Sequence, residues 1–294
     1  MLSLLIPTVA QGLLWALMAL GVYVTFRVLD IADLTVEGSF PLGAATAASM
    51  MLAGFGPLTA LLAAFVAGML AGVVTGLLHT KMKIPALLAG ILTMIALYSV
   101  NLRIMGKANL SLLGVDTTFK IAKSALDLSM AQTTLVVGLA VTLIVGFFMY
   151  WFFGTQIGAA IRATGFNQQM IRAQGVDTDI TIILGLLLSN GLVAVSGALV
   201  AQSNGFSDVG MGTGTIVIGL ASVIIGEVLF GTRSFKNCLI SVVLGSIVYR
   251  IVIAAVLAMG MPPNDLKLFT SVLVALALSM PLIKAKMGGR KAVR

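Results

Sequence analysis

Few residues of this sequence could do chemistry, and they form no catalytic pattern. The chain has a single histidine, His79, and a single cysteine, Cys238, which exclude a zinc cluster and an intramolecular disulfide framework. Its one Gly-Lys pair, at Gly106, lacks the spacing of a phosphate-binding loop. We therefore expect no enzyme activity, no metal and no cofactor on this chain. What remains is a set of charged and amide side chains within apolar runs.

Some of these polar residues could line a path for a solute or form a gate. On a continuous helix, Asp30, Asp33 and Glu37 fall at i, i+3 and i+7, which would place three carboxylates on one face. A solvated helix end is the alternative reading. Amides and hydroxyls could replace a solute's bonds to water, or could equally hydrogen-bond between helices. The candidate path or gate residues are Glu37, Ser189, Asn190, Gln202, Asn204 and Glu227.

One pair of opposite charges stands in or at the ends of neighbouring apolar segments. A charged side chain at the bilayer centre costs about 2.5–3.5 kcal/mol on insertion scales, so each one calls for a reason. Glu227 and Arg250 could offset this cost by pairing with each other. We predict a structural ion pair, with a role in gating as the alternative.

The chain that carries these residues has the composition of a membrane protein. Of its 294 residues, 59% are hydrophobic and 10% charged, with a mean hydropathy of +1.11, whereas soluble domains average about 25% charged residues. The run from Gly38 to Thr80 contains no Asp, Glu, Lys or Arg. A helix crosses the hydrocarbon layer in about 20 residues, so this run holds at least two crossings. A water-soluble enzyme and a disordered chain are excluded.

The apolar runs predict an all-α polytopic membrane protein with one transmembrane domain over residues 1–294. We expect eight to ten transmembrane helices, some short or broken, in the segments 4–26, 38–53, 58–78, 85–101, 131–153, 180–202, 213–230, 239–260 and 268–283. With the C-terminus in the cytoplasm, these segments place twelve lysines and arginines inside and five outside. This is the usual cytoplasmic excess, so we expect the N-terminus outside and residues 102–129 in an extracytoplasmic loop.

One glycine row indicates close helix packing. Gly68, Gly72 and Gly76 recur every four residues, on one face of the third segment. Small residues at this spacing let helix backbones approach closely in lipid. We predict internal packing along this face, with a contact between two copies of the chain as the alternative.

The segment 154–179 lies between two strong spans on the predicted cytoplasmic side. Residues 158–164 read as a short helical extension that Gly165 breaks. Asn167 can cap a second short helix, 168–174, which ends at the next glycine. On spacing alone, this could also be an ordinary loop with two anchoring arginines.

This loop resembles the coupling-helix loop of ABC-transporter permeases, most closely the branched-chain amino acid and ribose importer class. The matching and associated residues are Gly158, Arg162, Ala163, Gly165, Asn167, Arg172, Ala173 and Gly175. Residues 189–201 and 219–231 extend the resemblance. The stretches 32–44, 84–94 and 102–109 are similar to one subgroup, the tryptophan/tyrosine (aromatic amino acid) importers.

The resemblance implies the permease subunit of a type II ABC importer in the bacterial cytoplasmic (inner) membrane. Its expected partners are a second permease copy in a homodimer, a cytoplasmic ATPase dimer that binds ATP and Mg, an extracytoplasmic solute-binding protein and membrane lipid, but no nucleic acid. The short helix 168–174 would transmit ATPase closure in an alternating-access cycle. The alternative function is an ion-coupled secondary transporter or channel that needs no ATPase, which inverted repeats would favour.

Overall fold

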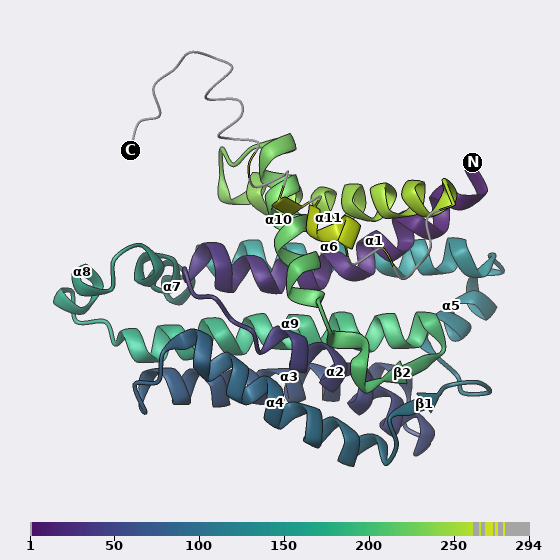
Figure 1. The fold of residues 1–294 in the computed structure, drawn as a ribbon, viewed down its shortest axis with the longest axis horizontal. Coiled ribbons are helices and arrows are strands. Elements are labelled where there is room, and N and C mark those ends of the chain that lie inside the picture. Colours follow the sequence, from purple (N-terminus) through teal and green to yellow (C-terminus); the bar gives the residue numbers. More distant parts are fainter. Residues whose placement is uncertain (1, 261–264, 266–267, 273, 276–278, 280–294) are drawn as a thin grey trace.

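The computed structural model describes residues 2–260, 265, 268–272, 274, 275 and 279, and it is almost entirely helical. In chain order the elements are α1 (Leu2–Tyr23), the π-helix η1 (Val24–Val28), α2 (Val36–Leu52), α3 (Pro57–Thr80), α4 (Ala86–Met105), β1 (Asn109–Ser111), α5 (Thr118–Leu126), α6 (Met130–Gly154), α7 (Gln156–Phe166), α8 (Gln168–Ala173), α9 (Thr178–Asn204), β2 (Phe206–Asp208), the 3-10 helix η2 (Val209–Gly212), α10 (Thr215–Phe230) and α11 (Phe235–Ala258). Most long helices lie along one axis, with α1 and α9 in the middle and α7 and α8 at one end (Figure 1).

The helices match the apolar runs of the sequence. Each of the eight segments expected between residues 4 and 260 coincides with a helix, and half of the ninth, 268–283, lies outside the described residues. Seven helices of the described part are long and apolar enough to cross a membrane. The remaining one, α2, has 17 residues and a length of about 25 Å, so it is shorter than the hydrocarbon layer of about 30 Å. The chain is a multi-pass membrane protein.

The segment 29–35 between η1 and α2 is a break in the helical path. Residues 30–33 have no regular structure, and Asp30 has a φ of +56°. The Asp33 carboxylate accepts a hydrogen bond from the backbone N–H of Thr35 at 2.9 Å, a local contact that competes with helix formation. The expected continuous helix with Asp30, Asp33 and Glu37 on one face is therefore wrong: Asp30 is exposed, Asp33 is buried, and Glu37 belongs to a separate helix.

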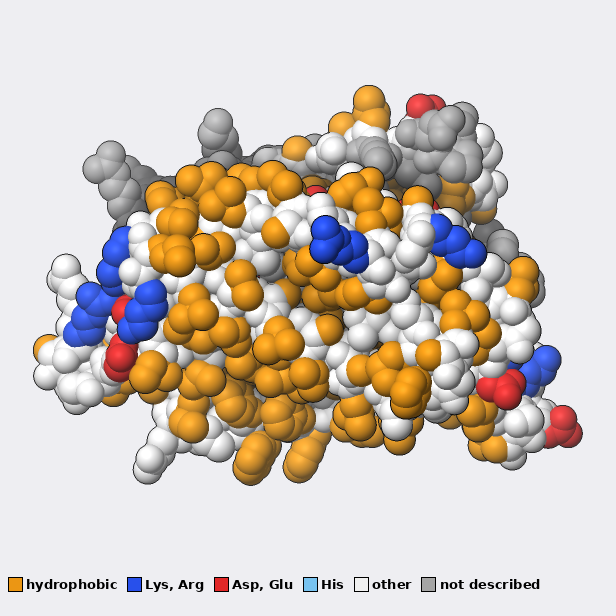
Figure 2. Space-filling model, turned by 90° about the horizontal axis from the view of Figure 1, so that it is seen from below, with side chains coloured by type: hydrophobic (Ala, Val, Ile, Leu, Met, Phe, Trp, Pro, Cys, Tyr) orange, Lys and Arg blue, Asp and Glu red, His pale blue; other side chains and the backbone are white. Residues whose placement is uncertain are grey.

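The two longest spans differ in their surroundings. In α9, 78% of an apolar stretch of 18 residues is buried inside the molecule, whereas in α6 the buried share of such a stretch is 17%. α9 packs against α1, α2 and α3, so it forms the centre of the fold, and α6 lies at the periphery. Large exposed apolar side chains on α3, α4 and α6 give the molecule an apolar outer surface, and Figure 2 shows one face of it.

The glycine row of α3 lies against α9 of the same chain. A Cβ atom would come within 2.4 Å of the Asn190 carbonyl oxygen at Gly68 and within 2.3 Å of the Leu186 carbonyl oxygen at Gly72. At Gly76 a Cβ would lie 2.9 Å from the Ile183 side chain and 3.1 Å from its Cα. At Gly68 and Gly72 the α3 and α9 backbones approach too closely for a side chain.

The loops at the end opposite α7 and α8 carry structure that the sequence did not reveal. Strands β1 and β2 pair antiparallel, with Asn109 opposite Asp208, and so join the loop after α4 to the loop after α9. The short helix α5 follows within the 102–129 segment, and Thr117 caps it. Three-residue strands and a nine-residue helix are too short to produce a clear period in the sequence.

Candidate functional site

The loop between α6 and α9 consists of two short helices at one end of the molecule. Helix α8 lies where the spacing predicts it, and the Asn167 side chain caps it by accepting from the Met170 N–H at 3.0 Å. Gly175 follows with a φ of +84°, which favours glycine at the end of a helix. Asp177 caps α9 by accepting from the Asp179 N–H at 2.8 Å.

Gly165 does not break the first of these helices, as the sequence suggested. Helix α7 continues through it to Phe166. A Cβ atom at Gly165 would lie 1.9 Å from the Val28 carbonyl oxygen, so glycine serves here for close contact between α7 and η1. The helix ends because Asn167 is extended, with φ −159° and ψ 98°.

Ionic contacts attach α8 to the transmembrane helices. Arg172 donates from Nε to the Thr178 hydroxyl at 2.6 Å, and its Nη2 lies 3.5 Å from the Asp179 carboxylate. Lys81 and Lys83, from the turn after α3, reach the same carboxylate at 3.3 and 3.8 Å. Asp179 therefore connects α8, the α3–α4 turn and the start of α9.

The tip of this loop exposes apolar side chains. Phe166 is 92% exposed and Met170 is 47% exposed. They lie at and just beyond the turn between α7 and α8, at one end of the long axis (Figure 1). Sequence reasoning singled out the glycines and arginines of the loop and missed this apolar tip, because an isolated Phe in a polar loop carries no periodic signal.

Arg162 points toward the transmembrane body. Its guanidinium lies 5.3 Å from the centre of the Phe235 ring, at the start of α11, and its Nε is buried without a hydrogen-bond partner. At Gly158, a Cβ would lie 2.3 Å from the Phe152 carbonyl oxygen. Both residues thus shape the junction of α6, α7 and α11, and Ala163 lies on the same helix α7.

Two candidate path residues take part in a buried polar network at the middle of α9. Asn190 donates to the Asp33 carboxylate at 2.8 Å and accepts from the Ser39 hydroxyl at 2.7 Å. The neighbouring Ser189 donates to the Gly21 carbonyl oxygen at 2.7 Å. All of these side chains are at most 3% exposed. A row of threonine hydroxyls joins the network across α3 and α4: Thr35, Thr75 and Thr93.

Two further candidates lie at the far end of α9. Gln202 is 2% exposed, and its side-chain oxygen accepts from the Thr118 N–H at 2.9 Å, so it anchors the start of α5. Asn204 is the exposed last residue of α9. Glu37, in the first turn of α2, accepts a hydrogen bond from the Gly214 N–H at 3.0 Å, just before α10 begins.

The expected ion pair between Glu227 and Arg250 is wrong. Glu227 pairs with Arg27 from the end of η1, whose Nε lies 2.8 Å from one carboxylate oxygen. Arg250 instead lies over the ring of Trp15, with its Cζ 4.1 Å from the ring centre. The partner of Glu227 is 200 positions away in the sequence, so the order of the segments did not indicate it.

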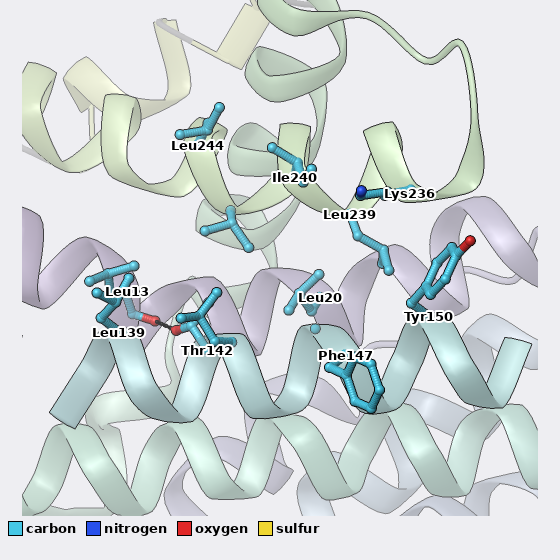
Figure 3. Close-up of a pocket in the computed structure, with 13 residues that line it drawn as sticks. Leu13, Leu20, Leu139, Thr142, Phe147, Tyr150, Lys236, Leu239, Ile240 and Leu244 are labelled. Carbon is cyan, nitrogen blue, oxygen red and sulfur yellow. Dashed lines mark hydrogen bonds between the residues drawn. The ribbon is translucent and has the colours of Figure 1, made fainter. Parts of the chain in front are cut away.

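Two cavities between the helices differ in chemistry. A groove of about 370 Å³ between α1, α6 and α11 is lined by apolar side chains, with Lys236 at one end (Figure 3). Of its two hydroxyl-bearing side chains, Thr142 already donates to the Leu13 carbonyl oxygen, and the other is Tyr150. A second cavity, of about 350 Å³ between α10, α11 and residues 270–271, has Arg250 and three hydroxyl-bearing side chains on its wall besides Tyr249.

Comparisons with known proteins agree along nearly the whole chain. The model of the family described as branched-chain amino acid transport system, permease component, matches residues 4–279. The tyrosine transport system permease protein of Clostridioides difficile is 41% identical over 93% of this chain and 90% of its own length. The galactofuranose transporter permease protein YtfT of Escherichia coli is 30% identical over 90% of this chain and 75% of its own length.

Solved structures share the fold at low sequence identity. An inward-facing metal-chelate type ABC transporter superimposes with a TM-score of 0.53 at 15% identity, covering 96% of this chain and 85% of that one. PsaBC from Streptococcus pneumoniae superimposes with a TM-score of 0.51 at 17% identity, covering 96% of this chain and 89% of that one. These likenesses establish the arrangement of the helices.

Proposed function

We propose that this chain imports an aromatic amino acid in partnership with a cytoplasmic ATPase dimer. The chain belongs to the family of branched-chain amino acid transport system permease components. The chain itself is a transport subunit and not an enzyme. The proposal for the solute draws on the name of the 41% identical relative, a tyrosine transport system permease. Two permease copies would enclose the path, and a solute-binding protein would deliver the solute from outside.

The observation that supports ATPase coupling is the way the α7–α8 loop is attached. Its tip presents the exposed Phe166, while the loop is held to the rest of the molecule at two places. Gly165 packs on η1, and Arg172 is bound to Thr178 and Asp179 of α9. A push on the tip would therefore reach both central helices, α1 through η1 and α9, as an ATPase-driven alternating-access cycle requires.

The same geometry supports the proposed orientation. Lys81, Lys83 and Arg172 gather around Asp179 at the α7–α8 end of the molecule. Cytoplasmic loops carry the excess of basic residues. We place this end in the cytoplasm, with β1, β2 and α5 outside, where they form a folded surface for a solute-binding protein.

Co-purification tests the coupling proposal. We expect the tagged chain, gently solubilised from its native membrane, to carry an ATPase subunit in near-equal ratio. Replacing residues 165–174 by a flexible linker should remove the ATPase and leave membrane insertion intact. A chain that purifies alone and transports in liposomes on an ion gradient would overturn the proposal in favour of an ion-coupled secondary transporter.

A further inference from the structure

Arg250 is an arginine within the membrane-spanning helix α11 that has no anionic partner among the described residues. Within the described residues, no carboxylate lies within 4.0 Å of its guanidinium, and its Nε is buried without a hydrogen-bond partner. By contrast, Arg27 holds Glu227 with two nitrogens. Ionisable residues inside a membrane domain are costly and normally pair with each other, with a backbone carbonyl or with a solute. Arg250 is therefore a candidate for binding an anionic ligand.

The surroundings of Arg250 leave room for such an anion. Its side chain lines the cavity of about 350 Å³ between α10 and α11, a volume within the range of small-molecule sites, about 300–1,000 Å³. Trp15 covers one face of the guanidinium, with 4.1 Å between Cζ and the ring centre. The flat edge of a guanidinium offers parallel N–H donors that match a carboxylate. A carboxylate fits this edge better than a single-point acceptor.

One residue of the cavity wall is bound to a carboxylate of the chain. Gly214 lines the cavity, and its N–H donates to the Glu37 side chain at 3.0 Å. Helix α10 begins directly after it, so Glu37 already occupies the N-terminal end of that helix. The cavity wall thus presents the cation of Arg250, while the Glu37 carboxylate is bound to Gly214 and is not itself part of the wall. This wall suits a ligand that carries a carboxylate.

We propose that Arg250 binds the carboxylate of the transported amino acid in the cavity between α10 and α11. The inference rests on the proposed function, because it assumes that the chain transports an amino acid. It adds the place where the permease would recognise the solute, and it names the carboxylate as the group of the solute that is bound.

The chain contains its own reporter for this site. It has two tryptophans, Trp15 under the Arg250 guanidinium and Trp151, which is 60% exposed on α6. In the variant Trp151→Phe, Trp15 is therefore the one tryptophan of this chain. The complex with the ATPase partner would be studied in lipid nanodiscs under excitation selective for tryptophan, and the same complex with Trp15→Phe as well would give the partner's emission for subtraction. The complex would be titrated with L-tyrosine and with tyramine, which lacks the carboxylate. We expect a saturable change of Trp15 emission with L-tyrosine and none with tyramine.

Substitutions of arginine separate recognition from a general effect of charge. Arg250→Gln should abolish the response to L-tyrosine and lower ATP-driven tyrosine uptake at least about tenfold, since a hydrogen bond to a charged group contributes about 1.5–3 kcal/mol. Arg250→Lys should retain part of both. The matched control is Arg103→Gln, at the exposed end of α4, which should change neither.

The outcomes distinguish this site from the proposed function. An equal response to tyramine, or full tyrosine uptake by Arg250→Gln, would overturn the site and leave the importer assignment intact. Loss of the permease dimer in Arg250→Gln, without any response of Trp15 to tyrosine in the parent, would also overturn it and assign the arginine to a contact between copies. Absence of ATP-driven tyrosine uptake in the parent would instead overturn the proposed function.

Discussion

Two polar regions of the molecule use their polar groups in opposite ways. One is the buried network around Asp33 and Asn190, and the other is the α7–α8 loop. In the network, every named side chain is nearly inaccessible and bonds to another helix of the same chain. In the loop, charges lie at the surface and tether a short helix, whose apolar tip points outward. The buried network around Asn190 thus holds helices of the fold together, and the exposed loop is available to a partner.

This difference makes Asn190→Leu the most damaging change that we predict. It removes the partner of the Asp33 carboxylate and of the Ser39 hydroxyl, both buried. We expect a loss of about 3–5 kcal/mol in the free energy of unfolding, because a buried acid would keep only its local bond to the Thr35 N–H and lose the side-chain donor at its second oxygen. The thermal midpoint in detergent measures it.

Asn101→Leu is the matched control for that change. Asn101 is also fully buried, but it donates one long hydrogen bond of 3.3 Å, to the Gly38 carbonyl oxygen, and its side-chain oxygen has no partner. Its replacement should lower the thermal midpoint clearly less. Equal losses at both positions would show that the network around Asp33 is not special.

Gly72→Ala should have the next largest effect on stability. The new methyl group would lie 2.3 Å from the Leu186 carbonyl oxygen, so α3 and α9 must separate. We expect a loss of about 1–3 kcal/mol, typical of overpacking. At Gly146 on α6, a Cβ meets nothing within 4 Å, and Gly146→Ala should be neutral or stabilising. A thermal midpoint shift of the same size in both variants would contradict the close α3–α9 contact.

Arg172→Gln should barely change the stability of the fold. The side chain is 56% exposed, and exposed ion pairs contribute about 0–1 kcal/mol. Its effect should appear in coupling instead, as a lower ratio of transported solute to hydrolysed ATP in proteoliposomes. A large fall in the thermal midpoint would show that the loop is part of the folded core.

Phe166→Ala should have the smallest effect on stability and a clear effect on partnership. At 92% exposure the ring contributes almost nothing to packing within the chain. We expect an unchanged thermal midpoint and a reduced yield of co-purified ATPase. Leu113→Ala is the control, since Leu113 is 86% exposed in the segment between β1 and α5. An equal loss of ATPase from the control would contradict a specific contact at Phe166.

The sequence predicted features that depend on neighbouring residues. Asn167 caps α8 within three positions, and Gly175 follows the helix with a positive φ. Each of the eight long apolar runs up to residue 260 became a helix. Partners far apart in the sequence escaped this reasoning. Glu227 was expected to pair with Arg250, yet Arg27 approaches it from the first helical segment.

The sequence by itself determined the class of the protein, the number and place of the described long helices, and the two-helix loop between α6 and α9, because apolar length and capping are encoded within a few residues. The tertiary structure alone decided that Asp33 meets Asn190, that Arg27 meets Glu227, and that Arg250 faces a cavity. The physical reason is that helices which are apolar around most of their circumference carry little record of their rotation or their neighbours. Those contacts arise only when the helices pack.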